Sequence, residues 1–246
     1  MFWSRKKNLP VTIDDKNWVE ESFIFLRDIL GHKHFDELVT ITPTNTFYNW
    51  TFKGTEEDAE FIFERTKELM LIDDSNIRIE YFSDQQMEMD DGTILSSPAD
   101  INGEWKSATG IYEEFEDEKV IYIEKSQLKN TFSLIATIAH ELSHIILLGE
   151  NRIEENDEYL TDLTAIAYGF GIFLGNSKFQ HYQFQNANSS GWQMSSQGYL
   201  PEEVIAYAMA WLSKHRNENT DYKKYLNTDI EKFFNQSFEY LKIENN

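Results

Sequence analysis

The sequence predicts an α+β protein whose C-terminal half is mainly helical. Apolar residues recur at three- and four-residue spacing through most of the chain, whereas alternation of apolar and polar residues is confined to a few short runs. Only 4 of the 246 residues are proline and 11 are glycine, so we do not expect long structureless linkers. We expect an N-terminal α/β region over residues 1–100 and a second region over residues 101–246.

The first region alternates between helical and extended patterns. Asp14 or Asp15 is a suitable N-cap for its first helix, and Gly31 is placed to end that helix. Thr55, with Asp58 three residues later, predicts the start of a second helix. The predicted elements are, in order, helix 14–30, strand 38–41, helix 55–70 and strand 76–82.

The second region begins with extended runs and continues with helices. Residues 83–108 are polar and predict loops with at most one short strand. Asn130 or Thr131 can cap the first long helix, and Gly149 is placed to end it as a left-handed residue. Pro201 is suited to the start of a later helix. The predicted elements are a hairpin of strands 109–115 and 119–124, helices 129–148, 157–174, 201–215 and 221–242, and a long loop over 176–200.

Composition excludes several classes of function. The net charge of −21 repels phosphate backbones and anionic membranes, so we expect neither nucleic acid nor membrane as a partner. The chain has no cysteine, which excludes disulfides, thiolate catalysis and cysteine-bound metals. No signal-peptide pattern is apparent, and no apolar run approaches the roughly 20 residues of a membrane span. A cytoplasmic protein is expected.

A His-Glu-x-x-His motif over residues 140–144 is the segment most informative about chemistry. On a helix, His140 and His144 are about 40° apart and one turn apart, so both can bind one metal ion. Glu141 points away from the metal but can reach a metal-bound water as a general base. Ser133 and Thr137 extend the same stripe with small polar side chains, which leaves room for a metal cavity.

Three other interpretations of this motif can be compared with it. A di-iron site needs a second Glu-x-x-His, and none of the other four histidines has a glutamate three residues before it. Peptide deformylases have the motif but also need a cysteine ligand, which this chain lacks. The third interpretation is structural: two histidines near the surface, with Glu141 as a solvated charge.

A catalytic zinc ion needs a third protein ligand. The candidates are acidic residues downstream of the motif, most of which would form a solvated acidic turn: Glu150, Glu154, Glu155, Asp157, Glu158 and Asp162. Glu158 is distinctive because it begins a new amphipathic helix. Asp162 lies four residues later on the same face, where it could accept the other ring N–H of a histidine ligand, with Thr161 close by.

The motif and the second helix together resemble the gluzincins, the thermolysin-like zinc peptidases. Residues 119–174 are similar to their pattern of His-Glu-x-x-His followed by Glu-x-x-x-Asp on a second helix. The resemblance implies a zincin-like domain in which Zn²⁺ is bound by two histidines and one glutamate, with a general base and an orienting aspartate. The implied residues are, as ligands, His140, His144 and Glu158; as general base, Glu141; and as the orienting carboxylate, Asp162.

One departure from this family is the spacing between the motif and the third ligand. Glu158 follows His144 by 14 positions, which is shorter than in thermolysin, so Glu155 and Asp157 stay as alternatives. The chain also resembles a group of uncharacterised bacterial His-Glu-x-x-His proteins. The shared segments are Ser126-Gln127-Leu128 and Thr161-Asp162-Leu163.

The leading hypothesis is a zinc-dependent hydrolase that cleaves peptides or proteins. The predicted hairpin could line its substrate cleft, and its acidic rim would favour cationic or neutral peptides. Tyr168, His181 and Tyr199 could stabilise an oxyanion, although a structural role suits each of them better. The alternatives are a regulatory or binding protein on the same scaffold, with one partner or no protease activity, and a purely structural protein. The sequence does not indicate the oligomeric state.

Overall fold

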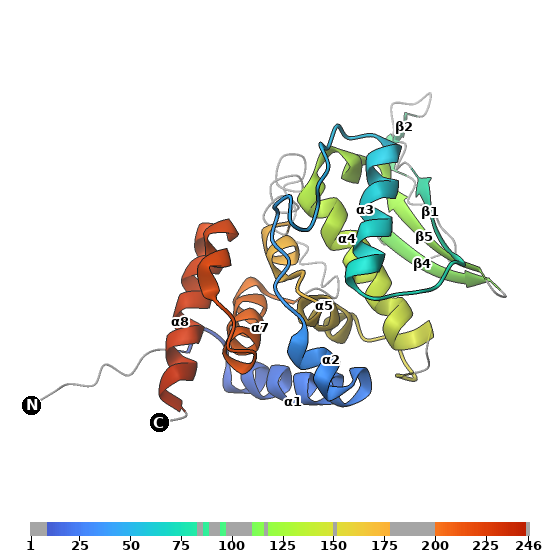
Figure 1. The fold of residues 1–246 in the computed structure, drawn as a ribbon. Coiled ribbons are helices and arrows are strands. Elements are labelled where there is room, and N and C mark those ends of the chain that lie inside the picture. The colour runs from blue at the N-terminus through green and yellow to red at the C-terminus, as the bar shows by residue number, and fades with distance from the viewer. Residues whose placement is uncertain are drawn as a thin grey trace, which may run out of the picture.

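The computed structural model describes most of the chain and has an α+β fold in which helices predominate (Figure 1). Strands 86–88, 94–96 and 110–115 and residue 118 are described by their backbone alone. The described residues are 9–82, 86–88, 94–96, 110–115, 118–149, 152–177 and 200–244. The expected boundary near residue 100 lies outside these ranges and stays a prediction.

A small mixed sheet forms one end of the molecule. Its strand order is β1 (Ile77–Phe82), β5 (Glu118–Glu124), β4 (Gly110–Phe115), with β5 parallel to β1 and antiparallel to β4. The predicted strand 76–82 and the predicted hairpin are therefore confirmed. Strands β2 (Gln86–Glu88) and β3 (Ile94–Ser96) form a separate antiparallel pair, so the polar segment has two short strands rather than at most one.

The helices form layers beside the sheet. Helix α4 contacts the sheet, α3 and α5, and α5 in turn contacts α1 and α7, while α8 covers α7 (Figure 1). Because α4 is in the middle of this arrangement, most of its side chains are buried. The helix bounds are α1 Ile13–Leu30, α2 His32–Glu37, α3 Glu56–Leu69, α4 Thr131–His144, α5 Glu158–Ala167, α7 Glu202–His215 and α8 Thr228–Glu244.

Local capping explains where the N-terminal helices begin. Thr55 and Asp58 form the predicted capping box at the start of α3, each side chain bonding the backbone of the other. The start of α1 differs from expectation, because Thr12 is the N-cap and Asp15 is the box partner three residues later. Gly31 follows α1 with φ 91°, in the left-handed region that its lack of a side chain permits.

The predicted strand 38–41 is wrong, because this segment is extended but joins no sheet. It lies against the end of α5, where the Ile41 amide donates to the carbonyl of Gly169 at 3.0 Å. Gly169 has φ 99°, and a side chain there would meet the Val39 carbonyl oxygen at 2.2 Å. This close approach interrupts the helix predicted over 157–174, which resumes only at residues 171–177.

The helices expected at 129–148 and 221–242 are also composite. The first consists of a 3₁₀ turn (Lys125–Lys129), α4, which Asn130 caps, and a π-helical turn (Ile145–Gly149). Gly149 has no positive φ, so its predicted left-handed conformation is wrong. The last helix is divided into a 3₁₀ helix (Thr220–Tyr225) and α8. The helix predicted over 201–215 is confirmed, with Pro201 as its N-cap.

The buried apolar residues form a core cluster to which both the N-terminal and the C-terminal helices contribute. Within the described part of the chain, one segment, Thr131–Gly149, is long and apolar enough to cross a membrane. However, 83% of its apolar window is buried inside the protein, as in a core helix.

Candidate metal centre

Helix α4 places three of the predicted site residues in the interior. His140, Glu141 and His144 are only 5%, 5% and 7% exposed, respectively. Ser133 and Thr137 of the same stripe are buried as well. The interpretation of the two histidines as surface residues and of Glu141 as a solvated charge is therefore wrong.

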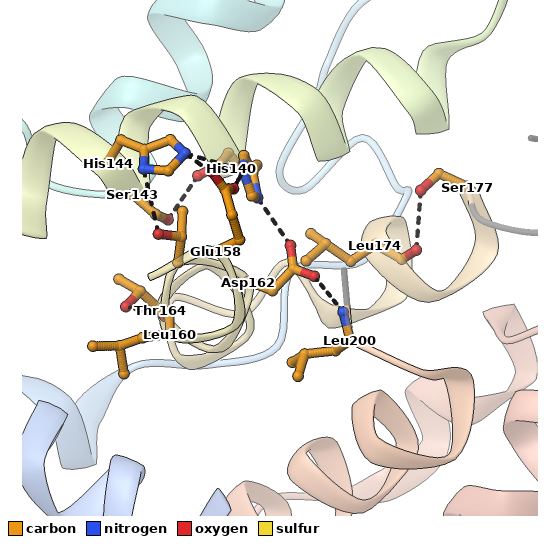
Figure 2. Close-up of polar contacts among 12 residues, drawn as sticks. His140, Ser143, His144, Glu158, Leu160, Asp162, Thr164, Leu174, Ser177 and Leu200 are labelled. Carbon is orange, nitrogen blue, oxygen red and sulfur yellow. Dashed lines mark hydrogen bonds and ion pairs between the residues drawn. The ribbon is translucent and has the colours of Figure 1, made fainter. Parts of the chain in front are cut away.

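Helix α5 brings two carboxylates to this stripe from the opposite side. Glu158 is its first residue and Asp162 lies one turn later, so both face α4 (Figure 2). Asp157 caps the helix by accepting a hydrogen bond from the Leu160 amide at 3.1 Å. That contact positions the first turn of α5, and with it Glu158.

Three ligand atoms converge in the space between these helices (Figure 2). The Nε2 atoms of His140 and His144 are 3.2 Å apart, and Oε2 of Glu158 lies 3.1 Å from the first and 3.5 Å from the second. Ligands at about 2.0–2.1 Å from a tetrahedral zinc ion lie about 3.3 Å from one another. The three residues can therefore bind one metal ion without moving far.

The opposite nitrogen of each histidine faces a polar atom of α5. Nδ1 of His140 lies 2.9 Å from Oδ1 of Asp162, whose second oxygen accepts a hydrogen bond from the Leu200 amide at 2.9 Å. Nδ1 of His144 lies 3.4 Å from Oγ1 of Thr161. These contacts leave both Nε2 atoms directed at the shared space, as metal ligation requires.

The groups of the site shift one another's pKa values. Burial by itself would lower the pKa of His140, but hydrogen bonds to Asp162 and Glu158 outweigh it and raise this pKa to about 10. Hydrogen bonds from His140 and His144 hold the pKa of Glu158 well below its usual range. Burial raises the pKa of Glu141. The His140 ring and the Glu158 carboxylate thus each favour the charged form of the other.

The other acidic candidates are not part of the cluster. Glu154, Glu155 and Asp157 are exposed, and Asp157 is engaged in capping. Glu150 lies outside the described residues. Among the residues that the structure describes, the group able to hold a metal consists of His140, His144 and Glu158.

The possible oxyanion stabilisers gain no support. Tyr168 follows the last turn of α5, far from Glu158, and its ring contacts His34 at 5.7 Å between centroids. His181 and Tyr199 lie outside the described residues, as does nearly all of the predicted loop 176–200.

Two contacts at the site were not predicted from the sequence. Thr161 was expected only to lie nearby, although its position three residues after Glu158 places it on the same helical face. The Leu200 amide leaves no signal in the sequence, because any non-proline residue has the same backbone donor.

No protein-family model, curated protein or solved structure matches this chain.

Proposed function

We propose that this protein is a zinc-dependent hydrolase that cleaves peptides or proteins. The main support is the triangle formed by the ligand atoms of His140, His144 and Glu158, with separations of 3.1–3.5 Å. Two imidazoles and one carboxylate are a common ligand set for catalytic zinc, which keeps a fourth position for water or substrate. The neighbouring Glu141 adds the general base that such a site needs.

Zinc at this site would supply a Lewis acid that polarises the scissile carbonyl and lowers the pKa of water. The chain's own residues would do the rest. Glu141 would accept a proton at its carboxylate and deliver it to the leaving group. Asp162 would keep His140 in the tautomer that has a free Nε2 lone pair, because its carboxylate accepts a hydrogen bond from the N–H at Nδ1.

Backbone and charge support a peptide substrate. Among the described strands, β4 pairs with β5 alone, so its other edge could bind an extended peptide by main-chain hydrogen bonds. The exposed acids Glu154, Glu155 and Asp157 precede Glu158 and favour cationic or neutral peptides over acidic ones.

The proposal includes a cytoplasmic location and no binding to nucleic acid or membranes. A cytoplasmic protein that binds neither nucleic acid nor membrane agrees with the net charge of −21. It also agrees with the burial of the one apolar helical segment found in the described ranges.

A second candidate is a regulatory or binding protein on the same scaffold. The observation that favours it is the deep burial of Glu141, which is 5% exposed. A base that is so enclosed would suit an enzyme restricted to one partner, or a site without protease activity.

The test combines metal content with cleavage. Purified protein is expected to contain about one zinc ion per chain and to cleave members of a fluorogenic peptide library whose sequences are neutral or basic. Glu141→Gln should keep the metal and lose at least about 100-fold in rate, because the general base is removed. Glu57→Gln, which changes an exposed acid on α3 away from the site, should change neither.

The outcomes separate the candidates. Zinc binding without cleavage by the wild-type protein would exclude the general peptidase and favour the regulatory protein. A protein that binds no zinc would exclude both.

A further inference from the structure

The two histidines of the metal centre are supported differently. Nδ1 of His140 faces the carboxylate of Asp162 (Figure 2). Nδ1 of His144 instead faces a hydroxyl, that of Thr161, at 3.4 Å. In histidine ligands of metals, the second ring N–H is almost always held by a carboxylate, a backbone carbonyl or water. A threonine hydroxyl in this place therefore needs its own explanation.

Burial makes an acceptor for His144 necessary. If Nε2 of His144 binds a metal, Nδ1 must carry the proton of the neutral ring. The residue is 7% exposed, so this N–H has little access to water. A buried N–H without an acceptor destabilises the folded state. Oγ1 of Thr161, at 3.4 Å, is positioned to be that acceptor.

The hydroxyl of Thr161 is oriented to accept. Its oxygen lies 2.9 Å from the carbonyl oxygen of Asp157, to which it donates its own proton. A hydroxyl has one proton, so the lone pairs of Oγ1 are left to face His144. Thr161 is fully buried, and its back-bond to Asp157 fixes its rotamer within the first turn of α5.

We propose that Thr161 is a positioning residue for the metal. Its hydroxyl accepts a hydrogen bond from the Nδ1–H of His144 and thereby holds the Nε2 lone pair toward the space shared by the three ligands. This inference rests on the proposed metal-dependent function. Two adjacent residues of α5, Thr161 and Asp162, then each fix one histidine of α4. The helix that supplies the third ligand, Glu158, also orients the other two.

A hydroxyl also limits the negative charge of the site. Glu141, Glu158 and Asp162 already bring three carboxyl groups close together. A fourth carboxylate, in the place of Thr161, would repel these three, whereas a hydroxyl satisfies the N–H without charge. Thr161 thus provides orientation at no electrostatic cost.

Thr164 offers a matched control for the test. It is also fully buried on α5 and makes the same back-bond, from Oγ1 to the Leu160 carbonyl at 2.8 Å, but it points away from the histidines (Figure 2). Replacing either threonine with valine removes a hydroxyl and keeps the shape of the side chain.

The experiment is a titration of full-length protein with Zn²⁺ against a chromophoric chelator. Thr161→Val should bind zinc roughly 10-fold or more weakly, Thr161→Ser should be close to wild type, and Thr164→Val should be unchanged. The absorption bands of bound Co²⁺ should shift in Thr161→Val alone, because only there does the His144 ring lose its orientation. Equal zinc affinities and cobalt spectra for Thr161→Val and wild type would overturn the inference.

A measurement on the wild-type protein covers the case in which Thr161→Val does not fold. In the zinc-loaded protein, nuclear magnetic resonance should show His144 with its proton on Nδ1 and slow exchange of that proton with water. Fast exchange would overturn the inference. If the wild type binds no zinc, the proposed function itself fails, whereas normal zinc binding with an unaffected Thr161→Val removes only the role of Thr161.

Discussion

Histidine and carboxylate meet at several places among the described residues, and two of these places have different neighbours. One place is the candidate metal centre between α4 and α5. The other, which we call the Asp36 cluster, consists of Arg27, Asp36 and His215, where α1, α2 and α7 meet. Asp36 accepts two hydrogen bonds from Arg27, at 2.7 and 2.8 Å, and lies 2.8 Å from Nε2 of His215.

The two places differ in whether an arginine or lysine side chain pairs with the carboxylates. In the Asp36 cluster, the guanidinium of Arg27 balances the carboxylate, and His215 stacks on Trp211 with 4.8 Å between ring centroids. At the metal centre, no lysine or arginine of the described residues pairs with Glu141, Glu158 or Asp162. Carboxylates that are grouped around histidines, without a lysine or arginine, are typical of a metal-binding site, whereas an arginine partner indicates a structural contact.

The largest expected effect is on zinc content, which should differ between variants of the metal centre and of the Asp36 cluster. His140→Ala should abolish stoichiometric zinc binding, because it removes one of three ligands, whereas His215→Ala should retain about one zinc ion per chain. Elemental analysis of the purified variants checks this. Zinc retained by His140→Ala would contradict the metal centre between α4 and α5. Zinc lost from His215→Ala would contradict the structural role of the Asp36 cluster.

Metal removal should have the next largest effect. A ligand at 100 times its dissociation constant stabilises the folded state by about 2.7 kcal/mol. For a chain of this size, this corresponds to roughly 5–10 °C in melting temperature. A chelator should therefore lower the melting temperature of the wild-type protein by that amount and leave His140→Ala unaffected. An identical decrease in both would assign the effect to something other than the metal centre.

Breaking the Asp36 cluster should cost less. Arg27→Met removes both hydrogen bonds to Asp36, but this ion pair is about one-third exposed and is screened by water. We expect the melting temperature to fall by less than about 4 °C, with zinc content unchanged. Calorimetry together with metal analysis tests this, and a loss of zinc would link the two regions that the comparison separates.

The smallest effect concerns acid stability. Hydrogen bonding to Arg27, followed by that to His215, holds the pKa of Asp36 well below its usual range. A depressed pKa stabilises the folded state above the unfolded value of about 3.9, and this contribution is lost as the pH falls below it. Asp36→Asn should therefore weaken the dependence of stability on pH below about 4. Urea unfolding of the wild type and Asp36→Asn at pH 3 and pH 6 tests this. An equal dependence of stability on pH in both proteins would contradict the assignment.

Local features of the fold were predictable, because neighbouring residues determine them. The capping box of Thr55 and Asp58 needs only residues within one turn, and it forms as expected. Strand alternation likewise identified β1 and the hairpin. The segment at 38–41 could not be distinguished from a strand by its sequence, because the backbone bond from Ile41 joins it to Gly169, just after α5 and far along the chain.

The candidate site divides in the same way. The spacing of His140 and His144 is a property of a single helix, so their common direction followed from the sequence. The sequence left the identity of the third ligand open among several acidic residues. The reason is that the number of residues between α4 and α5 does not determine the path of the chain between them. The structure brings Glu158 to the histidines and leaves Glu155 exposed.

By itself, the sequence determined the chemistry that is available: two histidines one turn apart, a glutamate beside them, many carboxylates and no cysteine. Only the tertiary structure decided which carboxylates meet the histidines and what holds each ring. Helical periodicity has a range of a few residues, whereas the contacts of Thr161, Asp162 and Leu200 depend on packing between segments 17 to 38 positions apart.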